Sequence, residues 1–138
     1  MDFLGGVLTG LIVAVVVRFV VDLYILPAIA LREAIWAVDH SIILYANCYS
    51  QLAPDELKIE AQSKFRNHAG KLSTRSRALI GHTFWSRIGL LPKQANILKA
   101  ADKLIFLAGC ARDKSSQAGM NASSAEDDIR RWLKIQTM

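Results

Sequence analysis

The first apolar stretch of the chain, residues 3–26, contains only two charged side chains, Arg18 and Asp22. A helix of this length is ~36 Å long, enough to cross the ~30 Å hydrocarbon core of a bilayer with some tilt. The acidic start at Asp2 and the length of the run disfavour a cleaved signal peptide, which leaves a buried helix of a soluble protein as the alternative. The pattern therefore predicts a transmembrane helix over residues 1–27.

Arg18 and Asp22 are four residues apart, so they would be neighbours on one face of that helix. An unpaired charge at the centre of a bilayer costs ~2.5–3.5 kcal/mol, and pairing offsets part of this cost. Two interpretations stay open. The pair marks the end of the span at the headgroups, or it faces the interior of a helix bundle, where it fixes the register or lines a polar path.

A periodic pattern of small and apolar residues follows the same helix. Gly6, Gly10 and Ala14 recur every four positions, which is typical of helices that pack closely in lipid. Beyond Pro27, where we expect a kink or a short break, apolar residues recur at alternating steps of four and three, as in a coiled coil. These residues are Leu31, Ile35, Val38, Ile42, Tyr45, Tyr49 and Leu52. We expect an oligomer seam along these positions, or the core-facing side of a globular helix over residues 31–52, and the two are not exclusive.

The rest of the chain has helical patterns and no run that alternates like a strand. Pro54, followed by two acidic residues, predicts one helix start, and Pro92 predicts another. Residues 115–124, SSQAGMNASS, are typical of a flexible linker, and a short amphipathic helix is expected over residues 125–136. We therefore predict an all-α fold, in which a transmembrane helix continues or kinks at Pro27 into a basic cytosolic helical domain over residues 28–114.

Residues 61–101 contain eight Lys and Arg residues but no Asp or Glu. Such unopposed positive charge favours an anionic partner. The open alternatives are lipid headgroups, a nucleotide or single-stranded oligonucleotide stacking on Phe65, Phe84 and Trp85, an acidic protein, or no partner at all. Residues 71–77, KLSTRSR, are the expected centre, because hydroxyl and guanidinium groups both bind phosphate oxygens. The candidate anion-binding residues are Lys64, Arg66, Lys71, Arg75, Arg77 and Arg87.

Catalytic chemistry is not indicated by the sequence. Cys48 and Cys110 have neither zinc-ligand spacing nor a disulfide framework, and the three histidines are scattered. No glycine-rich phosphate loop or hydrolase motif is present. We therefore expect a protein that is not an enzyme and has no metal or cofactor. All but one of the seventeen Lys and Arg residues follow Arg18, so the positive-inside rule predicts an external N-terminus and a cytoplasmic C-terminal domain.

Four segments together resemble a group of small bacterial inner-membrane proteins with one N-terminal span. They are LYILPAIALRE (23–33), LYANCYS (44–50), RIGLLPK (87–93) and IRRWLKI (129–135). Some proteins of this build resemble membrane effectors of phage-defence systems of the Hailong type, in which an oligonucleotide made by a partner nucleotidyltransferase controls the effector. The resemblance implies a homo-oligomeric effector of the bacterial inner membrane, such as an ion channel, but no particular ligand residues. The alternative is a non-catalytic anchor or scaffold that presents a helical docking domain to a protein or to anionic lipid.

Overall fold

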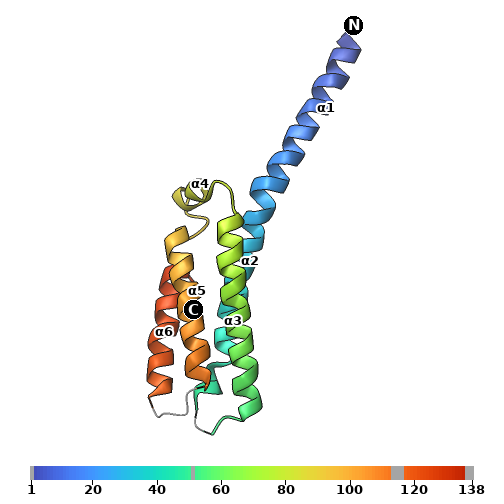
Figure 1. Ribbon diagram of the computed structural model, residues 1–138. Coiled ribbons are helices and arrows are strands. Elements are labelled where there is room, and N and C mark those ends of the chain that lie inside the picture. The colour runs from blue at the N-terminus through green and yellow to red at the C-terminus, as the bar shows by residue number, and fades with distance from the viewer. Residues whose placement is uncertain (1, 51, 113–116, 136–138) are drawn as a thin grey trace.

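A computed structural model describes residues 2–50, 52–112 and 117–135, and all regular structure within these ranges is helical. The helix α1 projects away from a bundle formed by the longer helices α2, α3, α5 and α6, and the short helix α4 lies at the end of the bundle where α1 leaves (Figure 1). The elements are α1 (Asp2–Val20), a π-helical turn η1 (Val21–Ile25), α2 (Leu26–Leu44), a 3-10 turn η2 (Ala46–Tyr49), α3 (Asp55–Ala78), α4 (His82–Arg87), α5 (Gln94–Arg112) and α6 (Ala118–Leu133). The predicted all-α fold is confirmed.

The first helices form one continuous helical run, Asp2–Leu44, whose most apolar part is long and apolar enough to cross a membrane. None of the α1 side chains is buried within the chain. An apolar helix without intramolecular contacts exposes a surface that water solvates poorly, so α1 needs lipid or another protein around it.

Pro27 does not break this run. One turn of π-helix precedes it, in which the Leu26 N–H bonds to the carbonyl oxygen of Val21, five residues earlier. A proline ring collides with the carbonyl group four residues before it and donates no hydrogen bond. The wider π-helical turn accommodates the ring at this point, and it keeps the helix continuous from α1 into α2.

The core of the bundle lies between α2, α3, α5 and α6. The apolar seam that was expected to join different copies lies in this core, with each side chain at most 8% exposed. Its residues are Leu31, Ile35, Val38, Ile42, Tyr45 and Tyr49. The prediction of an oligomer seam is therefore wrong for this segment, because side chains enclosed by the chain's own helices cannot contact a second copy. The core-facing alternative is confirmed from Leu31 to Tyr49, whereas Leu52 is 95% exposed.

The expected helix starts agree with the structure over the middle of the chain. α3 begins directly after Pro54 and continues through Gly70, and α5 begins two residues after Pro92. Gly81 and Gly89 have φ angles of 74° and 79°, and they lie on either side of α4. This left-handed conformation is accessible to glycine at little cost, so the two residues allow the sharp turns that enclose α4.

The flexible linker predicted over residues 115–124 is wrong from Ala118 onward, where α6 has already begun. Residues 115 and 116, like residue 136 at the end of the expected short helix, lie outside the described residues. Ala118, Ala122 and Ala125 are buried at helical spacing, followed by Ile129 and Leu133. The polar composition of this segment concealed a narrow stripe of alanines, and small side chains of this kind let α6 pack closely on the core.

Candidate functional site

The two charged residues of α1 form an ion pair on the exposed surface of the helix. Arg18 Nε donates a hydrogen bond of 3.1 Å to Asp22 Oδ2, as their spacing of four residues predicted. The side chains are 80% and 44% exposed, so no other part of the bundle covers them. In lipid this pair would remain partly desolvated and unshielded unless water, headgroups or a second helix surrounded it.

The small residues expected to mediate association lie on the same row of the helix as the ion pair. Gly6, Gly10 and Ala14 are exposed, and steps of four residues continue the row from Ala14 to Arg18 and Asp22. No atom lies within 4 Å of a Cβ built on Gly6 or Gly10, so nothing in the described chain occupies the space beside them. Helices that cross along an i, i+4 row would bring the small residues and the ion pair into one interface.

Several of the predicted anion-binding residues line a shallow groove along α3. Its volume is about 450 Å³, and its lining contains three cations and two neutral polar side chains but no carboxylate. The lining residues are Arg66, Asn67, Gly70, Lys71, Thr74 and Arg75. Because Gly70 has no side chain, the surface is hollow at the centre of this basic row. We call this surface the α3 groove.

A second depression, of about 640 Å³, lies between α3 and α5 and shares Arg66 and Gly70 with the α3 groove. Arg77 and Ser73 line it on the α3 side, and Asp102 of α5 adds a carboxylate. That carboxylate would repel an anion, so this depression is a weaker anion site than the α3 groove.

The six predicted anion-binding residues do not form one site. Arg66, Lys71 and Arg75 meet in the α3 groove, and Arg77 lies in the second depression. Lys64 is exposed on α3 but lines neither surface, and Arg87 is exposed on α4. Arg75 also has a structural role, because its Nη1 donates a hydrogen bond of 2.9 Å to the carbonyl oxygen of Ala30 in α2.

The aromatic residues do not provide a stacking platform for bases in the α3 groove. Phe65 is fully buried and meets the ring of Tyr45 edge to face, at a centroid distance of 5.9 Å, so its proposed role in stacking is wrong. Phe84 and Trp85 belong to α4 and pack against each other at 5.5 Å. The α3 groove can therefore bind phosphate groups, but it offers no aromatic ring on which a base could stack.

His68 lies beside the basic row and bonds to α2. Its Nε2 is 2.6 Å from Ser41 Oγ, and its Nδ1 is buried without a hydrogen-bond partner among the described residues. Burial lowers the pKa of His68, and the neighbouring Lys71 and Lys64 lower it further. The ring is therefore held neutral, and it adds no charge of its own to the anion-binding surface at neutral pH.

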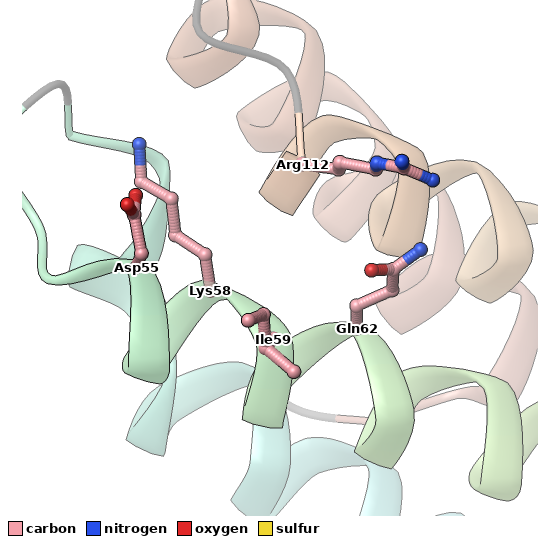
Figure 2. A pocket seen from close by; sticks show the side chains of 5 residues that line it. All are labelled: Asp55, Lys58, Ile59, Gln62 and Arg112. Atoms are coloured by element: carbon pink, nitrogen blue, oxygen red, sulfur yellow. The ribbon is translucent and has the colours of Figure 1, made fainter.

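A third depression, of about 380 Å³, lies at the end of the bundle away from α1, between the first turns of α3 and the last turn of α5. Figure 2 shows Asp55, Lys58 and Ile59 on one side and Arg112 on the other, with Gln62 extending toward Arg112. The lining mixes both signs of charge, and so it lacks the unopposed positive charge of the α3 groove. No group of three metal-ligating side chains is found in the described ranges.

Sequence reasoning missed a partly buried polar cluster that joins α6 to the first half of the bundle. Arg130 Nε lies 3.5 Å from Asp39 Oδ1. Burial raises the pKa of Glu126 and of the neighbouring Tyr49 hydroxyl, and it raises the pKa of the Cys48 thiol to about 11. All of these groups serve the packing of α6. The residues lie far apart in sequence, so only the alanine stripe of α6 could have indicated which faces meet.

Comparisons with protein families, with curated proteins and with solved structures find no match to this chain.

Proposed function

We propose that this chain is a homo-oligomeric, single-pass membrane effector, in which α1 helices associate in the bilayer and an anionic ligand bound to the bundle controls their state. The observation that carries the proposal is the exposed Arg18–Asp22 pair on a helix with no buried residue. Association along the row that contains the pair would remove it from lipid and surround it with neighbouring helices. A ring of such pairs would line a polar path for ions.

The α3 groove supports the second half of the proposal. It gathers Arg66, Lys71 and Arg75 without a carboxylate, which suits the phosphates of a nucleotide or a single-stranded oligonucleotide. The resemblance to membrane effectors of phage defence favours an antiviral channel of the bacterial inner membrane, with the bundle in the cytoplasm. The ligand would then be the product of a partner nucleotidyltransferase.

A direct test is ion flux through liposomes that contain the full-length chain. We expect flux that depends on an added oligonucleotide and that falls at least tenfold in an Arg18→Leu, Asp22→Leu double variant. The control removes another ion pair, Arg131–Asp128 on α6, whose atoms lie 2.6 Å apart and whose Asp128 also lies 3.7 Å from Lys103 Nζ of α5. Equal flux from both double variants would contradict a role of the α1 pair in conduction.

The second candidate is a non-conducting anchor that presents the bundle to a protein or to anionic lipid. It is favoured by the burial of the apolar stripe from Leu31 to Tyr49 in the chain's own core, since this stripe is then not available for self-association. A chain of this type would be monomeric in detergent and would leave liposomes impermeable to ions at every ligand concentration, so the flux measurement also separates the two candidates.

A further inference from the structure

The segment between α3 and α5 exposes apolar side chains at the end of the bundle that faces α1. Ile80, Phe84, Ile88 and Leu90 are each about half exposed, although α4 itself has only six residues. Phe84 of α4 and Ile88, the residue that caps the C-terminal end of this helix, are four residues apart and lie on the same side. A helix this short is unstable in water unless its apolar side chains pack against something. The exposed surfaces of Phe84 and Ile88 contribute no such packing within the chain.

This segment touches the end of the apolar helical run. A Cβ built on Gly81 would lie 3.5 Å from the ring of Tyr24 in the π-helical turn. A small cavity of about 130 Å³ then continues the contact, with Ile25, Ala28 and Arg32 on one side and Trp85 and Leu91 on the other. The exposed apolar surface of residues 80–90 is therefore continuous with that of the span, at the level where the span leaves the bilayer.

The lining of the cavity contains one cation, Arg32, and no acidic side chain. The indole N–H of Trp85 is buried and has no hydrogen-bond partner in the part of the chain that the structure describes. Arg32 is the one charged residue in the lining, and its guanidinium lies 5.8 Å from the ring centre of Trp36. A single cation among apolar side chains suits a ligand that carries both a negative charge and hydrocarbon.

We propose that residues 80–91 form a second membrane contact, and that the cavity between α2 and α4 binds an anionic phospholipid of the adjacent leaflet. The lipid phosphate pairs with Arg32, and its acyl chains cover Phe84 and Ile88. This inference rests on the membrane anchoring of α1 proposed above.

Three features favour a lipid over other anions. The lining of the cavity is apolar except for Arg32, which suits a molecule that carries both a phosphate and hydrocarbon. The site lies against the last turns of the span, where a phosphate group of the leaflet would be located. Exposed Arg87 lies within the segment and exposed Lys93 follows it, which gives the basic and apolar composition of interfacial helices. A nucleotide would leave the apolar side chains uncovered.

The contact would fix the bundle against the bilayer surface. A domain anchored by a single helix is free to tilt relative to the bilayer. Two membrane contacts, one through α1 and one through residues 80–91, would restrict that tilt. A bundle held in this way places the α3 groove at a defined height above the headgroups. Release or strengthening of the α4 contact would then change the angle at which α1 helices cross one another.

The first experiment measures where residue 84 lies. Full-length chains with a single tryptophan are placed in bilayers of equal parts phosphatidylcholine and phosphatidylglycerol, with bromine atoms near the headgroup end of the acyl chains. The parent carries Trp36→Phe, Trp85→Phe and Trp132→Phe, and the reporters are Phe84→Trp, Phe19→Trp in the span and Met120→Trp in the first turn of α6. We expect bromine to quench the reporters at positions 19 and 84 and not that at position 120.

The outcomes separate the two proposals. Quenching at position 19 without quenching at position 84 overturns the second contact but leaves the anchor intact. No quenching at either position overturns the anchor itself. Equal quenching at positions 84 and 120 shows general adsorption of the bundle to the bilayer, and it overturns a contact that is specific to α4.

The second experiment tests the cavity. Detergent-purified full-length chain with its native tryptophans is titrated with phosphatidylglycerol, and bound lipid is counted by native mass spectrometry. We expect Arg32→Gln to weaken retention about tenfold, as expected for the loss of one charge-assisted hydrogen bond. The control, Arg112→Gln at the far end of the bundle, should retain the lipid, and circular dichroism confirms folding of both. Equal retention of phosphatidylcholine, or displacement of the lipid by an oligonucleotide or by inorganic phosphate, overturns the proposal.

Discussion

Arg75 Nη1 donates a hydrogen bond of 2.9 Å to the carbonyl oxygen of Ala30, and this bond ties the last turns of α3 to the first turns of α2. The two residues are 45 positions apart in the chain. The bond lies near the end of the bundle where the span begins, so a residue expected from its charge to bind ligand also holds two helices together.

Replacing Arg75 by methionine should lower the free energy of unfolding of the bundle by about 1–3 kcal/mol, the usual effect of losing a hydrogen bond from a charged donor. Arg77→Met is the matched control, because no hydrogen bond of Arg77 to the bundle is found among the described residues and its side chain is exposed. Thermal unfolding in detergent, followed by circular dichroism, measures both. A larger loss for Arg77→Met would contradict the structural role of Arg75.

The neutral state of His68 makes the stability of the bundle depend on pH. Its pKa is lowered in the folded chain, so the unfolded chain binds more protons at mildly acidic pH. Stability is therefore fully present above the ordinary histidine pKa of ~6.5 and declines as the pH falls below it, by at most about 1.4 kcal/mol per pH unit. His68→Gln should flatten the decline between pH 7.5 and pH 5.5 in urea unfolding curves. An unchanged slope would assign the decline to other groups.

Because the apolar stripe of α2 is buried in the core, substitutions in it should affect the stability of the bundle and not the association of chains. Ile42 is 1% exposed, so Ile42→Ala should reduce the free energy of unfolding by about 2–5 kcal/mol through loss of apolar contacts and a cavity. Trp36→Ala, at an exposed position of the same helix, should have little effect on unfolding. Mass in detergent, measured by light scattering, should be the same for both variants. A loss of oligomers with unchanged unfolding in Ile42→Ala would restore the seam hypothesis.

The sequence predicted the helices better than it predicted their partners. Periodicity located α2 and α3, because each must present one apolar face to a core. The same periodicity cannot say whether Leu31 and Val38 meet another copy or the same chain, since burial satisfies both. The start of α6 was missed because serine, glycine and asparagine conceal a stripe of buried alanines. The contact of Arg75 with Ala30 depends on tertiary packing, and no local pattern encodes it.

The small residues of α1 allow a sharp test of association in the membrane. Gly10 has no neighbouring atom within 4 Å of a built Cβ, so Gly10→Leu should leave the bundle folded while it prevents close approach of a second α1. The mass in detergent should fall toward that of one chain. Gly5→Leu is the matched control, since Gly5 is equally unobstructed but lies on another side of the helix. Equal masses for the two variants would exclude the row of Gly6, Gly10 and Ala14 as an interface.

The α3 groove can be closed without damage to the helix that carries it. Gly70 lies inside α3, and no atom surrounds its missing side chain, so Gly70→Leu fits sterically and should stabilise the helix by about 0.5–1 kcal/mol. The same leucine fills the centre of the groove between Arg66 and Lys71. We therefore expect a variant that melts at a higher temperature and yet binds a single-stranded oligonucleotide at least tenfold more weakly.

Salt dependence then separates blocked access from lost charge. In the Arg66→Gln, Lys71→Gln double variant, the slope of log affinity against log salt concentration should become shallower by ~0.7 for each lost phosphate contact. Gly70→Leu removes no charge, so it should weaken binding chiefly by blocking the oligonucleotide from the groove and leave the slope nearly unchanged. Arg112→Gln removes one cation at the far end of the bundle and should preserve both affinity and slope. Fluorescence anisotropy of a labelled oligonucleotide measures all four chains. If Arg112→Gln reduces the slope as much for each cation removed as the Arg66→Gln, Lys71→Gln double variant does, binding is diffuse attraction to a basic protein, because a local site would respond only to the charges that line it.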